Sequence, residues 1–252
     1  MRPLILITND DGVTAKGLRA LDEVATEFGD VVVMAPMNNA SGTSHSITAS
    51  RPLRVRDVKQ APELSVYCCD GTPVDCVKLA VEYFCPRRPD LVLSGINHGS
   101  NSSINVLYSG TMGAVIEATA LGYDAIGFSL LSHSAEADFS GCIPYVRQII
   151  GTTLEKGLPT NVSLNVNIPR LSASEINGIR ICHEAKARWE DSFEKRIDPQ
   201  GRPYWWLTGK FKCNDPSENS DEWALAHGYV SVVPIHPDFT NYSAIDDLKR
   251  LY

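Results

Sequence analysis

The amino-acid sequence predicts an α/β fold in which a mostly parallel sheet is covered by helices on both faces. Strand-like and helix-like segments alternate through residues 4–130. The strand-like segments are unbroken runs of Val, Ile and Leu, such as LILIT (4–8) and VVVMAP (31–36), without polar alternation. Strands with this composition are typical of parallel sheets buried on both faces.

The helices are predicted from apolar spacing and from end signals. In residues 17–29, Leu18, Leu21 and Val24 recur at helical spacing, and Gly29 stands where a C-cap glycine would. Residues 72–84 begin with Thr72 as N-cap and Pro73 at the first helical position. The other two predicted helices are 111–122, rich in small residues and closed by Gly122, and 143–156.

The remaining segments of this half are predicted strands. Pro36 ends the strand at 31–36, and PDLVLSG (89–95) and DAIGFSL (124–130) are further buried strands. Residues 51–58 and 63–69 are predicted to form a pair of exposed edge strands.

After residue 160 the pattern changes. Strands are predicted at 162–169 and 228–235, a last helix at 242–251, and a hairpin at 192–209 that turns on Asp-Pro-Gln-Gly. Tyr204, Trp205 and Trp206 on the hairpin indicate either core packing or a subunit contact. We therefore expect one domain over 1–252, with a core in 1–160 and C-terminal strands, hairpin and tail in 161–252.

Composition narrows the class of protein. The 252 residues carry a net charge of −7, which argues against a nucleic-acid polymer as partner. The seven cysteines are odd in number and form no C-x-x-C, so reduced cysteines in a cytoplasmic protein are expected. The sequence shows no membrane span and no signal peptide, because its apolar runs are too short.

Oxygen-bearing side chains follow three of the predicted parallel strands. Asp10 and Asp11 come after the first strand, Ser41 after the second, and Asn97 after DLVLS. Parallel sheets bind ligands at the carboxyl ends of their strands. Two carboxylates about 4 Å apart repel by roughly 4 kcal/mol at an effective dielectric of ~20, and a bound Mg²⁺ or Mn²⁺ would offset that. Adjacent Asp residues are also common turn formers and helix caps.

A second feature fits a phosphate. YSGTMGAVIEA (108–118) opens a helix with Ser109, Gly110 and Thr111, and backbone N–H groups at a helix start bind phosphate well. The alternative is a plain N-cap. His45 and His98 lie in the same loops and are candidate proton relays.

Two protein classes also begin with a strand followed by acidic residues, but this chain lacks the residue that performs the chemistry of each. A receiver domain needs an Asp at the end of the PDL strand, where this chain has Ser94-Gly95. A haloacid-dehalogenase-type phosphatase needs D-x-D-G, and NDDG has Asn9 at the nucleophile position. A non-catalytic nucleotide or metal sensor stays open as an alternative to an enzyme.

Several stretches together resemble the SurE (survival protein E) family of metal-dependent 5′/3′-nucleotidases. They are ILITNDDGVTAKGL, VVVMAPMNNASGTSHSIT, GTPVDCVKLA, PDLVLSGINHGSNSSINVLYSGTMGAVIEA, LNVNIP, DPQGRPYWWLTG and GYVSVVPI, which run from residue 4 to 235. The combination of TNDDG, SGIN-x-G-x-N and YSGT in this order is specific.

The resemblance implies a Rossmann-like core with one divalent ion per subunit, Mn²⁺ or Mg²⁺. The implied metal ligands are Asp10, Asp11, Ser41 and Asn97, and Asn101, Ser109, Gly110 and Thr111 are implied to lie near the substrate phosphate. Asp10, Asp11 and Asn97 are the expected catalytic residues. The expected reaction is hydrolysis of nucleoside monophosphates, with 3′-nucleotides and short polyphosphate as further candidate substrates. The family exchanges its hairpin and tail between subunits, so a homodimer or homotetramer is expected.

Overall fold

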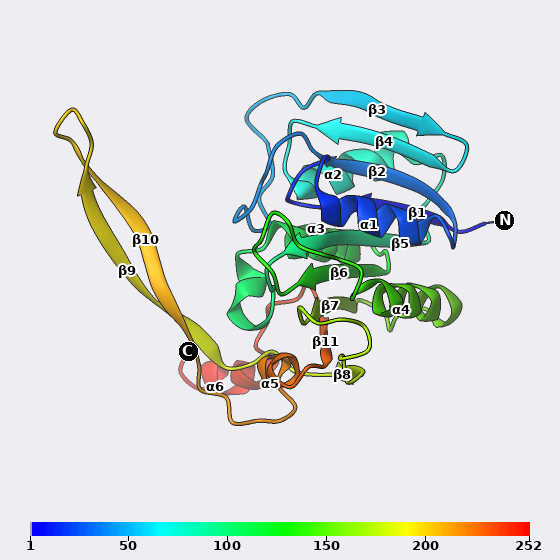
Figure 1. Cartoon of the computed structure of the whole chain (residues 1–252). Coiled ribbons are helices and arrows are strands. Elements are labelled where there is room, and N and C mark those ends of the chain that lie inside the picture. The colour runs from blue at the N-terminus through cyan, green and yellow to red at the C-terminus, as the bar shows by residue number, and fades with distance from the viewer. Residues whose placement is uncertain (1) are drawn as a thin grey trace.

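A nine-stranded sheet runs through the protein in its computed structural model, which describes residues 2–252 (Figure 1). The strand order is β3-β4-β2-β1-β5-β6-β7-β11-β8. These strands are β1 (Leu4–Thr8), β2 (Asp30–Pro36), β3 (Val55–Ala61), β4 (Leu64–Cys69), β5 (Leu91–His98), β6 (Ala125–Leu130), β7 (Ser163–Ile168), β8 (Ile179–Ile181) and β11 (Val230–Ile235). The run from β4 to β7 is parallel, while β3 and β11 pair antiparallel to β4 and β7.

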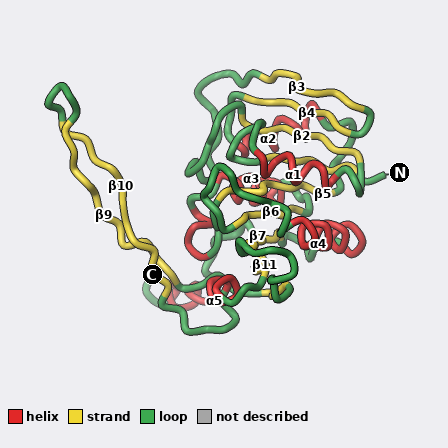
Figure 2. Tube along the Cα trace, viewed as in Figure 1, coloured by secondary structure: helices red, strands yellow, loops and turns green. Residues whose placement is uncertain are grey.

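Helices lie on both faces of this sheet, as Figure 2 shows. The helices are α1 (Lys16–Ala25), α2 (Pro73–Leu79), α3 (Gly110–Ala120), α4 (Ile143–Lys156), α5 (Asp221–Ala226) and α6 (Ile245–Lys249), with a π-helix η1 (Ala80–Phe84) and 3-10 turns η2 (Ser103–Leu107) and η3 (Tyr242–Ala244). None of the helices in residues 2–252 combines the length and the apolar character that a membrane crossing needs. The predicted α/β class is confirmed.

The core is divided into two clusters because successive side chains of a strand point to opposite faces. Ile5 and Ile7 of β1 pack with α1 and α4 on one face. Leu4 and Leu6 of the same strand pack with α2 and α3 on the other. Each continuous apolar run in the sequence therefore supplies both cores at once.

Two helix starts follow their predicted signals. Thr72 and Asp75 form a reciprocal capping box at the start of α2, with Pro73 as the first helical residue. Ser109 caps α3 by accepting a hydrogen bond from the Met112 N–H over 3.0 Å. The end of α1 was wrongly predicted, because this helix ends at Ala25. Gly29 instead passes so close to the chain that a Cβ there would lie 2.2 Å from the Pro3 carbonyl oxygen.

The sheet differs from the prediction at one edge. Of the two segments predicted as edge strands, only β3 lies at the edge, since β4 lies between β3 and β2 and is half-buried. The predicted strands at 51–58 and 63–69 were not distinguished from each other, and β8 and α5 were not predicted because they are too short to show a periodic pattern.

The C-terminal hairpin forms a sheet of its own. Its strands β9 (Ala187–Ile197) and β10 (Pro203–Cys213) extend well beyond the predicted 192–209 and project away from the body of the molecule (Figure 1). Trp205 and Trp206 are more than half exposed, so the first of the two predicted roles, core packing, is wrong within this chain.

Candidate active site at the carboxyl edge of the sheet

Three neighbouring parallel strands bring the predicted site residues to one edge. The strands β2, β1 and β5 lie side by side in that order. Asp10 and Asp11 follow β1 directly, and Asn97 stands at the end of β5. The Ala40 N–H donates to the Asp10 carbonyl oxygen over 2.7 Å, which holds the loop that contains Ser41 against the end of β1.

Asp10 is the buried member of the acid pair. It is 3% exposed, and its Oδ1 accepts a 2.5 Å hydrogen bond from the Thr111 hydroxyl. Burial raises the pKa of Asp10 to about 6, and the charge of Asp11 adds to that rise while the bonds from Thr111 oppose it. The site therefore has excess negative charge in a place with little water.

Asp11 is held by the residue that follows Asn97. Its Oδ2 lies 2.9 Å from His98 Nδ1 and also accepts the His98 backbone N–H over 3.2 Å. The other ring nitrogen, Nε2, is buried and has no hydrogen-bond partner among residues 2–252. His98 is thus placed to orient Asp11.

The start of α3 packs against Asp10 through Gly110. A Cβ at this position would lie 2.9 Å from the Asp10 Cβ and 3.0 Å from the Thr43 hydroxyl oxygen. Contacts this short do not occur between real side chains, so only glycine allows the helix N-terminus to approach the acid. Ser109, Gly110 and Thr111 therefore lie together beside Asp10, at the end of α3 where N–H groups have no partner within the helix.

Asn97 and Asn101 are both buried but are held differently. Asn97 donates through Nδ2 to the Gly99 carbonyl, which leaves its Oδ1 as an oxygen donor. Asn101 donates through Nδ2 to the Ser129 hydroxyl over 2.9 Å. Its backbone is fixed on both sides: its N–H donates to Asn167 Oδ1 and its carbonyl accepts from Asn165 Nδ2, each over 2.8 Å.

Sequence reasoning missed the part played by Asn165 and Asn167. Both are buried on β7, and Asn167 Nδ2 donates to Asn165 Oδ1. A signal was present, since LNVNIP places two amides two positions apart, and therefore on one face, in a mostly buried strand.

Two predicted residues, Ser41 and His45, form hydrogen bonds with groups other than the two acids. Ser41 is exposed, and its N–H donates to Asn39 Oδ1. His45 Nε2 lies 2.9 Å from Glu117 Oε2 on α3, where Lys78 also pairs with Glu117. Burial disfavours the Glu117 carboxylate, yet the bonds from Lys78 and His45 lower its pKa overall. The contacts of His45 attach its loop to α3 rather than to Asp10 or Asp11.

The donor set fits a hard divalent cation. Within residues 2–252, no group of three or more His, Cys, Asp or Glu side chains is arranged to hold a metal ion. Two carboxylates with neutral oxygens from Asn and Ser are the ligands that Mg²⁺ and Mn²⁺ prefer. The raised pKa of Asp10 agrees with a cation site: burial disfavours the charged carboxylate, and a bound cation would stabilise it.

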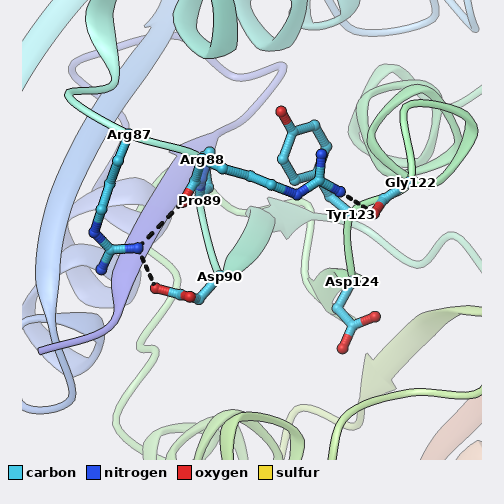
Figure 3. Close-up of a pocket in the computed structure, with 7 residues that line it drawn as sticks. All are labelled: Arg87, Arg88, Pro89, Asp90, Gly122, Tyr123 and Asp124. Carbon is cyan, nitrogen blue, oxygen red and sulfur yellow. Dashed lines mark hydrogen bonds and ion pairs between the residues drawn. The ribbon is translucent and has the colours of Figure 1, made fainter. Parts of the chain in front are cut away.

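A different pocket, shown in Figure 3, does not belong to this site. Asp90 and Asp124 line it and directly precede β5 and β6, so it lies at the opposite, amino-terminal edge of the sheet. Its guanidinium groups already have partners: Arg87 pairs with Asp90 over 2.8 Å, and Arg88 bonds the Gly122 carbonyl and lies 4.2 Å above the Tyr123 ring.

The fold and the site together define an α/β protein that brings two acids, neutral side-chain oxygens and a helix N-terminus to one sheet edge. Sequence comparison then identifies the chain as a member of the SurE family, since the family profile described as "Survival protein SurE" matches residues 5–191.

Relatives and a solved structure agree over nearly the whole chain. The chain is 53% identical to 5′-nucleotidase SurE of Christiangramia forsetii over 250 residues, 98% of this chain and 96% of that protein. It is 51% identical to 5′-nucleotidase SurE of Flavobacterium psychrophilum, with 99% and 97% covered. The crystal structure of SurE protein from Aquifex aeolicus matches with a TM-score of 0.85, 38% identity and 99% of each chain covered.

Proposed function

We propose that this protein is a metal-dependent 5′-nucleotidase, a phosphoric monoester hydrolase that converts nucleoside monophosphates to nucleoside and phosphate. The observation that supports it most is the approach of the α3 N-terminus to the buried Asp10 through Gly110. That approach supports the proposal because a helix N-terminus, which can bind an anion, lies beside an acid, which can bind a cation. The names of the full-length relatives support the same activity.

We assign the metal ligands as Asp10, Asp11, Ser41 and Asn97, with Mn²⁺ or Mg²⁺ as the ion. When bound, such an ion supplies positive charge that polarises a phosphoryl oxygen and lowers the pKa of water. Two carboxylates and two neutral oxygens bring the loaded site close to zero net charge, so the site does not repel a phosphate dianion.

The residues of the chain then bind and orient the substrate. Asn101, Ser109, Gly110 and Thr111 lie near the phosphate, where helix N–H groups stabilise charge on its equatorial oxygens. Asp10, Asp11 and Asn97 are the catalytic residues. Asp11 is better suited than Asp10 to orient the attacking water, because its side chain is 11% exposed and its Oδ2 is fixed by His98.

The proposal also covers the oligomeric state, the cellular location and the domain organisation of the protein. We infer a homodimer or homotetramer that uses the hairpin and tail of 161–252, because β9 and β10 expose Phe193, Trp205 and Trp206. The seven thiols are free, which fits a cytoplasmic location. Residues 1–160 and 161–252 are taken as parts of one domain, since β7 and β11 belong to the same sheet as β1.

The test is phosphate release by the full-length protein from a panel of nucleoside 5′-monophosphates. Activity with Mn²⁺ or Mg²⁺ should disappear in excess EDTA and return when the metal is restored. The 3′-nucleotides and short polyphosphate serve as comparison substrates. Full activity in excess chelator would contradict the metal assignment, and nucleotide binding without phosphate release would favour a sensor.

A further inference from the structure

Asp221, the first residue of α5, is fully buried and connects three segments that lie far apart in the sequence. Its Oδ2 accepts the Ser103 N–H over 2.8 Å, and its Oδ1 accepts the Ala185 N–H over 2.9 Å and the Glu222 N–H over 2.8 Å. Burying a carboxylate is costly unless hydrogen bonds compensate for the lost water, so these three N–H groups hold the acid in place. Asp221 therefore ties the loop after β5 and the base of the hairpin to α5 (Figure 1).

Glu222 makes a second connection to the same loop. Its Oε1 accepts a hydrogen bond from the Ser102 hydroxyl, and the Ser102 Oγ also lies 2.5 Å from the Ser100 Oγ. The Ser103 hydroxyl donates to the Ala185 carbonyl over 2.8 Å. Two successive residues of the loop are thus bonded to α5 and to the base of the hairpin, through both side-chain and backbone groups.

The residues held in this way belong to the stretch 101–109, which carries a proposed phosphate contact at each end, Asn101 and Ser109. Ser103 has a φ of 53°, in the left-handed region that residues other than glycine seldom adopt. A backbone conformation of this kind persists only where surrounding contacts fix it, and the bond to Asp221 is such a contact. The course of loop 101–109 therefore depends on an acid that is 118 positions beyond Ser103.

We propose that Asp221 and Glu222 are positioning residues, which hold loop 101–109 in the conformation that presents Asn101 and Ser109 to a phosphate group. The inference rests on the proposed function and adds α5, which the sequence did not predict, to the support of the site. The assigned metal ligands all lie outside loop 101–109. The two acids should therefore affect the binding of phosphate and leave the binding of the metal unchanged.

The main test is Asp221→Asn, which keeps the shape of the side chain but offers one acceptor oxygen in place of two. When the amide oxygen faces Ala185 and Glu222, the amide NH₂ faces the Ser103 N–H, and that bond is lost. On the Mn²⁺-loaded full-length protein, we expect the calorimetric Kd for inorganic phosphate to rise about tenfold, with the affinity for Mn²⁺ unchanged. Hydrogen exchange of peptides from 101–109 should become faster, while peptides from β1 and α1 keep their protection.

Asp215→Asn is the matched control. Asp215 accepts the Lys186 N–H over 3.0 Å and the Ser217 N–H over 2.9 Å, so it also ties the base of the hairpin, but to residues outside loop 101–109. Its phosphate affinity and the exchange of loop 101–109 should match those of the parent protein. Equal effects of Asp215→Asn and Asp221→Asn would assign the change to the base of the hairpin and overturn the proposal.

Glu222 provides a second pair of variants that does not require Asp221→Asn to fold. Glu222→Ala removes the acceptor of the Ser102 hydroxyl and should weaken phosphate binding in the same direction. Glu222→Gln keeps an oxygen acceptor at that position and should retain most of the phosphate affinity.

The proposal is overturned if Asp221→Asn and Glu222→Ala bind phosphate as tightly as the parent protein. It is also overturned if exchange rises equally throughout the chain, because the acids then stabilise the fold as a whole. If the parent protein neither hydrolyses nucleotides nor binds phosphate, the proposed function fails. The exchange of peptides from 101–109 still decides in that case whether the two acids hold the loop.

Discussion

The hydroxyl of Thr111 and the carboxylate of Asp10 are joined by a hydrogen bond of 2.5 Å that connects α3 to the end of β1. This bond partly opposes the rise that burial produces in the pKa of Asp10. The helix that would bind an anion therefore also holds the acid that would bind a cation. A change on either side should disturb both functions of the site.

Asp11→Asn should reduce phosphatase activity by about a hundredfold or more while the fold stays intact. The substitution keeps the volume and removes the charge that a divalent ion needs. Mn²⁺ affinity, measured by calorimetry, should fall together with kcat, and the thermal midpoint should move little. Asp30→Asn changes an acid at the amino end of β2 and is the matched control, with activity expected to match the parent. Near-normal turnover of Asp11→Asn would exclude the assignment of this acid.

Gly110→Ala should damage the site more than the fold. The new Cβ would lie 2.9 Å from the Asp10 Cβ, so either α3 or Asp10 must shift. We expect a stability loss of about 1–3 kcal/mol from overpacking, together with weaker Mn²⁺ binding and a lower kcat. Urea unfolding and metal titration on the same protein separate the two effects. An alanine variant with unchanged metal affinity would show that the close approach is not needed.

Most of this fold and much of this site follow from local sequence, for reasons visible in particular residues. The acids of NDDG had to meet the loops after β2 and β5, because continuous apolar runs predict parallel neighbours with a common carboxyl edge. The Ser109 cap was predictable from its residue type and position. Long-range contacts could not be predicted: no residue near Gly29 in the sequence indicates that Pro3 lies beside it in the fold. The same applies to His98, whose bond to Asp11 joins residues 87 positions apart.

Asn167→Leu tests whether the hydrogen bond from the Asn101 N–H to Asn167 holds Asn101 in place. The hydrophobic periodicity of the sequence does not reveal this bond. The substitution leaves the buried Asn101 N–H without its acceptor, which costs about 1–3 kcal/mol of stability. Because Asn101 is expected near the phosphate, inhibition by inorganic phosphate should weaken as well. Ser231→Ala is the matched control. Ser231 on β11 lies opposite Asn167 of β7, and the buried Ser231 hydroxyl has no hydrogen-bond partner among residues 2–252. Equal phosphate inhibition in the parent and Asn167→Leu would remove Asn167 from any role in the site.

The half-buried Asp22 on α1 should contribute less to stability at neutral pH than at acidic pH. Burial raises the pKa of Asp22 from 3.8 to about 6, and the charge of Glu23 adds to the rise. The folded state thus binds more protons than the unfolded state between these values, so this contribution to stability is present below pH 3.8 and is lost as the pH rises to about 6.

Asp22→Asn removes the titrating group and keeps the shape of the side chain. We expect it to increase the free energy of unfolding by about 1 kcal/mol at neutral pH, allowing for solvent screening, and by much less near pH 4. Urea unfolding at both pH values measures the difference. Glu155→Gln, an exposed acid on α4, should give no such pH-dependent gain. A gain of the same size at both pH values would mean that the substitution acts through packing or helix propensity and that Asp22 does not titrate as described.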